Sequence, residues 1–355
     1  MNNVKFPGLG GLELAVSDIA LKIGPFSIFG NEIGPISIYW YGIIIAAAFL
    51  TAVILALRQS EKFGIKQEDF IDLILFAAPV GIIGARLYYV IFSWESYRDD
   101  PLEIFRIWHG GLAIYGGIIA GLVTAYFFAK AKKINPLQLL DFGVPYIAIA
   151  QAIGRWGNFV NQEAFGTNTT LPWGMTSQRV QNELFRLQME GQNVNPDLPV
   201  HPTFLYESLW NLMIFAVLIW YRKRRRANGE VVCLYMVLYG LGRFFIEGLR
   251  TDSLLLGNLR ISQVLAALFV LVFSILLFRT IRKAGEAEIT AEVGTSEYGA
   301  VLMSMKEEEA HQQAAEAEAE TKEEAGQEEQ DDIPQEEEAV TEQSDAEPQE
   351  KENKE

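Results

Sequence analysis

The chain has 355 residues, of which 50% are hydrophobic and 21% are charged. From Ala284 to the end it holds 25 acidic and 4 basic residues, whereas residues 1–283 hold 20 acidic and 25 basic residues, so the net charge of −16 comes from the tail. The acidic total therefore says nothing about the partner of the apolar body, and the single cysteine, Cys233, excludes a disulfide framework.

Residues 1–37 form an N-terminal segment in which Pro7, Pro25 and Pro35 act as breakers. This mixture is compatible with short strands, turns or an interfacial segment. A cationic start followed by an apolar stretch and a small-residue cleavage site is not apparent, so we expect membrane insertion to depend on the later spans.

From Ile38 onward, apolar runs of about 20 residues recur, which is the length that a helix needs to cross a hydrocarbon layer of roughly 30 Å. Lipid favours helices because each backbone group must be bonded within its own segment, and no alternating pattern suggests a barrel. We therefore predict an all-α polytopic membrane protein with seven transmembrane helices within residues 38–283. The predicted spans are 38–57, 70–92, 110–130, 136–155, 203–221, 231–249 and 260–279.

The charges between the spans predict the orientation of the chain. Basic residues follow the first, third, fifth and seventh spans, at positions 58–66, 130–133, 222–226 and 279–283. The positive-inside rule places these ends in the cytoplasm, so the N-terminus is outside and the C-terminus inside. The polar connection 157–200 is then a small extracytoplasmic cap, and residues 284–355 have the composition of an acidic, disordered cytoplasmic tail.

The most polar interruption of the apolar pattern is the stretch from Gly154 to Gly166, with the sequence Gly-Arg-Trp-Gly-Asn-Phe-Val-Asn-Gln-Glu-Ala-Phe-Gly. An arginine, two asparagines and a glutamate thus lie where the fourth span leaves the bilayer. A charged side chain near the hydrocarbon costs roughly 2.5–3.5 kcal/mol, and such residues usually face a protein interior or a watered cavity. We therefore expect this stretch to carry function.

Further polar clusters fall at the same predicted outer level. Tyr41 lies in an aromatic group at the start of the first span, which is also typical of an interfacial belt. Arg86 lies well inside the second span, where a structural ion pair and a functional contact are both open. His109 precedes Gly110-Gly111 at the third span, and glycines allow a ligand to approach closely.

The fifth and sixth spans add the remaining candidates. His201 precedes Pro202 at the start of the fifth span, and it either caps the helix and pairs with Glu207 or belongs to a site. On the sixth span, polar residues spaced by four, four and three positions share one helical face, which in lipid implies an enclosed polar seam. These residues are Tyr239, Arg243, Glu247 and Arg250.

Several arginines at one membrane level point to a phosphate, because the planar guanidinium matches phosphate oxygens bidentately and a lipid headgroup is the phosphate at that level. No Walker loop, dinucleotide-binding glycine pattern, cysteine-pair zinc spacing or nucleophile elbow is present. A zinc site from His109, His201 and a carboxylate lacks any short ligand spacing. We therefore expect no metal, no cofactor and no nucleic acid partner.

The stretch Gly154–Gly166 resembles the signature of the bacterial prolipoprotein diacylglyceryl transferases. Supporting motifs occur in the family's order at Trp40–Gly42, Gly84–Arg86, His109–Leu112, His201–Glu207 and Tyr239–Arg250, and the likeness runs from about Gly34 to Lys283. The resemblance implies a seven-helix enzyme of the bacterial cytoplasmic membrane. Such an enzyme transfers a diacylglyceryl group from phosphatidylglycerol to the lipobox cysteine of a prolipoprotein signal peptide, and it releases glycerol 1-phosphate in the first step of lipoprotein maturation.

Carried onto this chain, the resemblance implies a phosphatidylglycerol site and a set of reacting groups. The headgroup site would be formed by Arg155, Asn158, Asn161, Glu163 and Gly166, with Arg86, His201, Glu207, Glu247 and Arg250 in support. The catalytic set would be Tyr41, His109, Tyr239 and Arg243. Because a free thiol is mostly protonated at neutral pH, His109 with Tyr239 is the expected base, while Arg155 and Arg243 hold the phosphate.

Two other classes of membrane protein remain as alternatives. A transporter or flippase for an anionic lipid would also use arginine-lined helices, but it commonly shows repeated halves and polar groups across the midplane. An intramembrane protease would need an aspartate pair or a serine dyad within the spans, and neither is evident.

Overall fold

The computed structural model describes residues 2–28, 31–251, 255–256, 259–295, 311–312 and 314. It divides into two units, Met1–Gly285 and Glu286–Glu355. The first unit contains the helix bundle and the predicted site.

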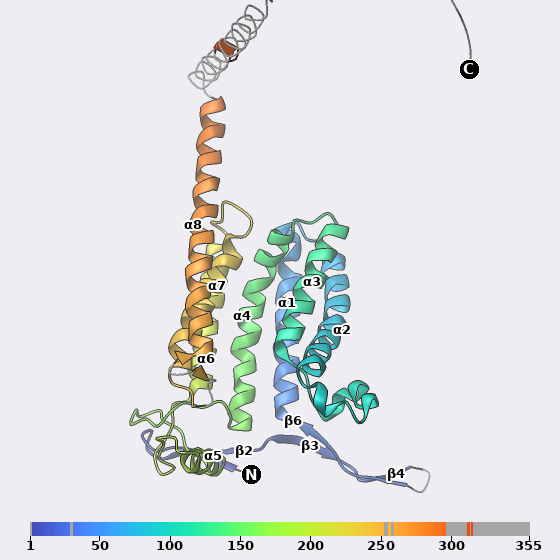
Figure 1. The fold of residues 1–355 in the computed structure, drawn as a ribbon, viewed down its shortest axis with the longest axis vertical. Coiled ribbons are helices and arrows are strands. Elements are labelled where there is room, and N and C mark those ends of the chain that lie inside the picture. Colours follow the sequence, from blue (N-terminus) through green and yellow to red (C-terminus); the bar gives the residue numbers. More distant parts are fainter. Residues whose placement is uncertain are drawn as a thin grey trace, which may run out of the picture. The chain divides into compact units, whose positions relative to one another are not determined.

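Long helices follow the predicted spans (Figure 1). Six of the described helices are long and apolar enough to cross a membrane, which confirms a mostly helical, multi-pass membrane protein. They are α1 (Trp40–Ser60), α2 (Gln67–Phe92), α3 (Ile114–Ala131), α4 (Pro136–Asn161), α6 (Thr203–Tyr221) and α8 (Ile261–Thr295). The predicted sixth span corresponds to α7 (Glu230–Glu247), which is not among these six helices because its 18 residues include three charged side chains, Glu230, Arg243 and Glu247.

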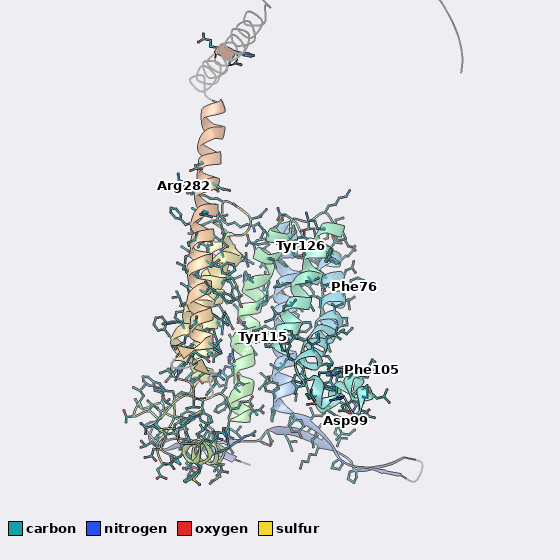
Figure 2. All side chains as sticks on the ribbon, in the orientation of Figure 1. Phe76, Asp99, Phe105, Tyr115, Tyr126 and Arg282 are labelled. Atoms are coloured by element: carbon teal, nitrogen blue, oxygen red, sulfur yellow. The ribbon has the colours of Figure 1, made fainter. Side chains whose placement is uncertain are left out.

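Large apolar side chains cover the outside of the bundle, as expected where lipid is the solvent. Phe76 and Tyr126 point away from the helices (Figure 2), and their exposed fractions are 60% and 49%. Small residues occupy the contact between α2 and α3 instead. A Cβ atom on Gly84 would lie 2.8 Å from the carbonyl oxygen of Gly116, so α2 and α3 approach each other through glycines.

Helix α4 occupies the middle of the bundle, with α1 on one side and α6 and α7 on the other (Figure 1). It begins at a strong N-terminal signal, because the Asn135 side chain accepts hydrogen bonds from the backbone N–H groups of Leu137 and Gln138, and Pro136 takes the first helical position. It extends to Asn161, beyond the predicted end at residue 155, so eight of the thirteen residues of the Gly154–Gly166 stretch are helical.

The connections rich in basic residues lie together at one end of the bundle (Figure 1). There Asp141, which is fully buried on α4, accepts hydrogen bonds from the backbone N–H groups of Gly229 and Val232 at 2.8 and 2.9 Å. The Arg225 guanidinium lies 3.2 Å from the same carboxylate. Arg222, only 7% exposed, donates to the Tyr146 hydroxyl at 2.9 Å. This internal use of the basic segment was not predicted.

Strands form the N-terminal segment at the opposite end of the bundle, which is one of the alternatives that the sequence left open for residues 1–37. They pair antiparallel as β1 (Asn2–Phe6) with β2 (Leu12–Val16), β3 (Ile19–Ile23) with β6 (Ile36–Tyr39), and β4 (Phe26–Ile28) with β5 (Asn31–Ile33). Strand β6 runs directly into α1. A further short pair, β7 (Leu255–Leu256) and β8 (Leu259–Arg260), precedes α8.

The connection 157–200 folds at the same end around a short amphipathic helix, α5 (Gln178–Met189). Ser177 caps its N-terminus by accepting a hydrogen bond from the backbone N–H of Val180 at 3.2 Å. Its apolar face packs into a buried cluster that also includes residues from β1 and α6. The cluster comprises Val4, Phe165, Met175, Val180, Leu184, Leu187, Val194, Val200 and Phe204.

The last helix, α8, continues past Ala284 to Thr295, whereas the acidic tail was expected to be disordered from residue 284. Most of the predicted tail lies outside the described residues, so its disorder stays a prediction.

Candidate functional site

The Gly154–Gly166 stretch forms the end of α4 and the turn that follows it. The helix stops at Gln162, whose φ of 50° places it in the left-handed region, and Ala164 also has a positive φ of 55°. The side-chain amides of Asn158 and Asn161 both donate to the Glu163 carboxylate, at 3.0 and 3.2 Å. The asparagines and the glutamate therefore hold one another in a fixed turn.

Two glycines of the stretch lie where no larger residue fits. A Cβ atom on Gly157 would lie 2.8 Å from the Tyr41 ring, so α1 brings Tyr41 directly against α4. A Cβ atom on Gly166 would lie 2.8 Å from the Cβ of His201 and 3.0 Å from the carbonyl oxygen of Leu249. Gly166 thus occupies a crossing point of separate segments of the chain.

Those segments are joined by short backbone bridges. The backbone N–H of Gly166 donates to the carbonyl of His201 at 2.9 Å, and that of Thr167 donates to the carbonyl of Leu249 at 2.7 Å. Gly166 and Arg250 form an antiparallel bridge. The glycine at the end of the stretch therefore fixes Arg250 beside α4 and α6.

Buried carboxylates gather three arginines from different parts of the chain. Glu207 on α6, 4% exposed, has one oxygen 2.7 Å from Arg155 of α4 and 3.8 Å from Arg243 of α7. Its other oxygen lies 3.5 Å from Arg250. Glu247, 3% exposed, pairs with Arg243 at 2.6 Å. We refer to Arg155, Glu207, Arg243, Glu247 and Arg250 as the arginine–glutamate cluster.

The arginine–glutamate cluster connects to the turn through Arg155, whose guanidinium lies 3.5 Å from the side-chain oxygen of Asn158. Arg155 and Arg243 each keep 24% of their side chains exposed, and Arg250 keeps 14%. The carboxylates are thus buried while the arginine side chains remain partly accessible. This arrangement can present several N–H donors to an anion, which is the geometry that recognises phosphate.

The predicted His201 takes part in a chain of hydrogen bonds outside the arginine–glutamate cluster. The Trp173 indole N–H donates to the Tyr206 hydroxyl at 2.7 Å, and that hydroxyl lies 3.1 Å from Nδ1 of His201. Because indole can only donate, the hydroxyl accepts from Trp173 and is free to donate to Nδ1. In that arrangement His201 is neutral with its proton on Nε2, and burial, which lowers the pKa of this imidazole, favours the neutral ring.

We expect acidification to weaken the segment around His201. Because its pKa is lowered in the folded protein, the stabilisation by the neutral ring is present above the ordinary value of about 6.5 and is lost as the pH falls towards the folded value. The protection factors of the amides of Val200, His201 and Thr203, that is, exchange corrected for the pH dependence of the intrinsic rate, should therefore fall between about pH 7 and pH 5. His201→Gln should abolish that pH dependence, and an unchanged profile in this variant would contradict the assignment.

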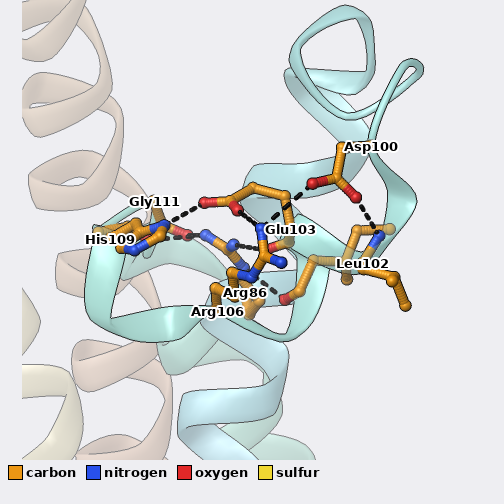
Figure 3. A network of polar contacts seen from close by, with 9 residues as sticks. Arg86, Asp100, Leu102, Glu103, Arg106, His109 and Gly111 are labelled. Atoms are coloured by element: carbon orange, nitrogen blue, oxygen red, sulfur yellow. Dashed lines mark hydrogen bonds and ion pairs between the residues drawn. The ribbon is translucent and has the colours of Figure 1, made fainter. Parts of the chain in front are cut away.

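His109 lies in a separate polar network at the start of α3 (Figure 3). It ends a short 3₁₀ helix, Ile107–His109, which follows another one, Pro101–Phe105. Its Nδ1 atom lies 2.5 Å from Glu103, whose other oxygen pairs with Arg106 at 2.9 Å. The hydrogen bonds from His109 and Arg106 lower the pKa of Glu103. The sequence analysis missed Glu103, although an acidic residue six positions before His109 in a short connection was a usable signal.

Arg86 contacts backbone rather than a carboxylate. Its guanidinium donates to the carbonyl oxygens of Glu103 and Gly110 at 2.6 Å, of Ile104 at 2.8 Å and of Gly111 at 3.0 Å (Figure 3). The side chain is 5% exposed. Gly111 has a φ of 75°, and a Cβ atom there would collide with this guanidinium. These contacts give Arg86 a structural role, because they hold the loop that carries His109.

Tyr41 also borders a cavity of about 660 Å³ at the start of α1. The wall from α1 is apolar and aromatic, whereas Asp18, Asn161 and Arg179 contribute polar groups. The predicted Tyr239 stacks on Tyr235 with ring centroids 5.8 Å apart, one turn before Arg243 on α7. The predicted residues thus fall into three hydrogen-bonded groups, around Glu207, around His109 and around His201, while Tyr41 and Tyr239 lie on α1 and α7.

Comparisons with known proteins show which family this chain resembles. Residues 29–279 match the family model described as prolipoprotein diacylglyceryl transferase. A phosphatidylglycerol–prolipoprotein diacylglyceryl transferase of Listeria monocytogenes is 44% identical over 271 residues, covering 73% of this chain and 92% of the relative. Relatives with the same name from Clostridioides difficile and Streptococcus agalactiae are 44% identical over 69% and 72% of this chain, and the matches cover 90% and 93% of those proteins.

Proposed function

The chain belongs to the prolipoprotein diacylglyceryl transferase family, and from this membership we infer that it transfers a diacylglyceryl group from phosphatidylglycerol to a prolipoprotein. It is a transferase of lipoprotein biosynthesis and a multi-pass membrane protein. The observation that supports the lipid substrate best is the arginine–glutamate cluster beside the turn of the Gly154–Gly166 stretch.

The proposed reaction forms a thioether. The sulfur of the lipobox cysteine attacks the glycerol carbon that bears the phosphate ester, and a C–S bond forms as the C–O bond breaks. The electron pair of that C–O bond leaves with glycerol 1-phosphate, and the thiol proton passes to a base. The reaction therefore needs a cationic site for the leaving phosphate and a proton acceptor beside the thiol.

The charges of the arginine–glutamate cluster suit such a leaving group. Among these five described residues three arginines face two glutamates, and this excess of positive charge suits the negative charge of a phosphodiester. As the ester bond breaks, the phosphate gains further negative charge beside guanidinium groups that are already in place. Preorganised charges of this kind stabilise the transition state more than the bound substrate. We assign Arg155, Arg243 and Arg250 to phosphate and the two glutamates to holding them.

The turn residues receive positioning roles in this proposal. Asn158, Asn161 and Glu163 shape the wall beside Arg155, and Gly166 with His201 fixes the segment that carries Arg250. Arg86 is a positioning residue for the loop before α3. We assign His109, with Tyr239, to the thiol proton, and we place Tyr41 at the lipid-facing edge of the site.

The orientation follows from the two ends of the bundle. We propose that the end with the basic connections faces the cytoplasm of a bacterial cell and that the site faces outward in the cytoplasmic membrane. Helix α7 is then the sixth of seven spans, and the α5 unit with the N-terminal strands is the extracytoplasmic cap. This side suits the substrate, because the cysteine of a prolipoprotein follows a membrane-inserted signal peptide.

The test is transfer by purified protein in detergent, with phosphatidylglycerol labelled in its diacylglyceryl part and a peptide containing a lipobox cysteine. We expect Arg155→Ala to lower the rate by about 100- to 1,000-fold, the usual loss when one preorganised donor to a developing charge is removed. The matched control is Arg186→Ala, because Arg186 pairs with Glu183 and Glu190 on the exposed face of α5.

Label on the peptide that depends on both its cysteine and Arg155 would establish the activity and the headgroup site together. Equal loss in the Arg186 control would instead indicate a general charge effect. A folded wild-type protein that binds the lipid but labels no peptide would contradict the transferase and favour lipid transport.

A further inference from the structure

We propose that the ribbon formed by β3 and β6 lies on the membrane surface, with one face in the headgroup region of the lipid leaflet at this end of the bundle. The partner of that face is lipid, and the placement does not depend on the proposed reaction. Strand β3 (Ile19–Ile23) lies before residue 29, where the match to the family model begins, whereas β6 (Ile36–Tyr39) lies within the match. The ribbon thus joins a strand from outside the family match to one inside it.

The register of the two strands collects apolar side chains on one face. Leu21 lies opposite Ile38, and Ile23 lies opposite Ile36. Residues directly opposite each other in an antiparallel pair point to the same side, as do residues two positions apart along a strand. The four side chains therefore share a face, and their exposed fractions run from 37% for Ile38 to 54% for Ile36. The protein leaves this apolar face open.

The opposite face of the ribbon is polar. It carries Lys22 and Ser37, which lie directly opposite each other. A two-stranded ribbon is at best marginally stable in water, so it needs a surface against which to bury its apolar side. Exposed apolar patches that are bordered by polar residues mark sites of protein or membrane contact. The two faces of the ribbon therefore fit a boundary with lipid on one side and water on the other.

The connection to α1 indicates that this boundary is the membrane surface. Strand β6 runs directly into α1, and the backbone N–H of Trp40, the first residue of α1, donates to the carbonyl of Asp18 at 2.9 Å. The start of β3 and the end of β6 are thus both fixed where a helix long and apolar enough to cross the membrane begins. From this point the ribbon runs crosswise to the helices (Figure 1). It therefore follows the plane of the membrane.

Ile38 shows to which side the apolar face turns. It lines the cavity at the start of α1 together with Ile43 and Ala46, which belong to the first two turns of that helix. The apolar face thus turns toward the side chains with which α1 enters the bilayer. Tyr39 and Trp40, which are 51% and 42% exposed, lie at the same level, and aromatic residues of this kind concentrate where a membrane meets water.

The backbone sets the depth of the ribbon. In the described part of the chain, β3 and β6 make a two-stranded sheet, so each strand has an edge that no further strand covers. Such edges do not occur against lipid within the hydrocarbon core, because no water reaches them there. The ribbon therefore lies among the headgroups, where its edges stay hydrated and its apolar side chains reach toward the acyl chains. At that level it also holds the cavity wall that Ile38 contributes.

Cysteine labelling tests the placement, because the only cysteine of the chain, Cys233, is buried. In a Cys233→Ala background, Leu21→Cys, Ile23→Cys and Ile36→Cys are labelled one at a time with the environment-sensitive fluorophore NBD. Each labelled protein is reconstituted into phosphatidylcholine nanodiscs. Fluorescence is then quenched either by lipid that carries a doxyl group near its headgroup or by iodide in the buffer.

The matched controls are Lys22→Cys and Ser37→Cys, each one position from a test site on the same strand but on the opposite face. Doxyl lipid should quench the apolar-face labels at least about twofold more than these controls, because successive side chains of a strand point to opposite faces. Iodide should show the reverse order. Phe76→Cys near the middle of α2, where the native side chain is 60% exposed, is the reference for a label that faces the acyl chains.

Two results would overturn the proposal. Equal doxyl quenching on both faces, or iodide access to every label, would show that the ribbon stands in water. Protection from iodide without doxyl quenching would show that protein, such as a second copy of the chain, covers the apolar face. One test site and its neighbour suffice to read the pattern, so a single variant that fails to fold leaves the test intact. No turnover is needed, so failure of the proposed function would leave the result readable.

Discussion

Glu207→Ala is expected to abolish most of the transfer and to destabilise the protein. The side chain is 5% exposed and contacts Arg155, Arg243 and Arg250. Removing one partner of a buried ion pair costs about 3–5 kcal/mol, because the remaining charges lose their compensation. With the guanidinium groups no longer held together, we expect transfer to fall at least about 100-fold. Thermal unfolding in detergent and the labelled-lipid assay measure the two effects.

Added sulfate should show whether the instability of Glu207→Ala comes from the loss of the negative charge among the three arginines. Sulfate that binds only the folded variant would raise its unfolding temperature by mass action, since it replaces the missing negative charge. Glu190→Ala is the matched control, because Glu190 pairs with Arg186 on the exposed face of α5. Wild-type transfer by Glu207→Ala, or an equal loss of stability in Glu190→Ala, would contradict the role of Glu207 as the centre of the arginine–glutamate cluster.

Asp141→Ala is expected to give the largest loss of stability at the other end of the bundle. Asp141 is fully buried and accepts from the backbone of Gly229 and Val232, which begin α7, and it also pairs with Arg225. Its removal leaves a partly buried arginine and two backbone donors without their acceptor. We expect a loss of about 3–5 kcal/mol, measured by denaturant or thermal unfolding in detergent.

Asp72→Ala serves as the control for Asp141. Asp72 is 45% exposed and pairs with Lys132 at 3.0 Å near the same end of the bundle. Exposed ion pairs contribute about 0–1 kcal/mol, so this variant should unfold close to wild type. Similar losses in both variants would show that Asp141 has no special role in docking α7 to α4.

The helices could be predicted because the membrane makes each apolar run long and uniform. The C-terminal end of α2 at Phe92 and that of α6 at Tyr221 were predicted to the residue. The comparisons confirm the family resemblance that the Gly154–Gly166 stretch carries. Seven spans, the orientation and the roles of the site residues stay predictions. For the N-terminal segment the sequence left strands, turns and an interfacial segment open, because short strands lack a strong periodic pattern.

The partners of polar residues were harder to predict than their presence. Arg86 stood out in an apolar helix, but the sequence could not show that the acceptors of its hydrogen bonds are backbone carbonyl groups 17 to 25 residues away. Asp141 did not stand out at all, because its contacts lie 84 to 91 residues further along the chain. Such pairings are set by which helices meet, and no local pattern records that.

The basic segment after α6 has consequences for biogenesis. While the chain is being inserted, all the cationic side chains of residues 222–226 are available to oppose translocation. Folding then withdraws Arg222 to Tyr146 and Arg225 to Asp141, so these two cations stop acting as topogenic signals and become tertiary contacts. In the orientation proposed above, the same arginines that oppose translocation of the nascent chain would thus lock the folded protein in place, since inverting it would require the bundle to unfold first.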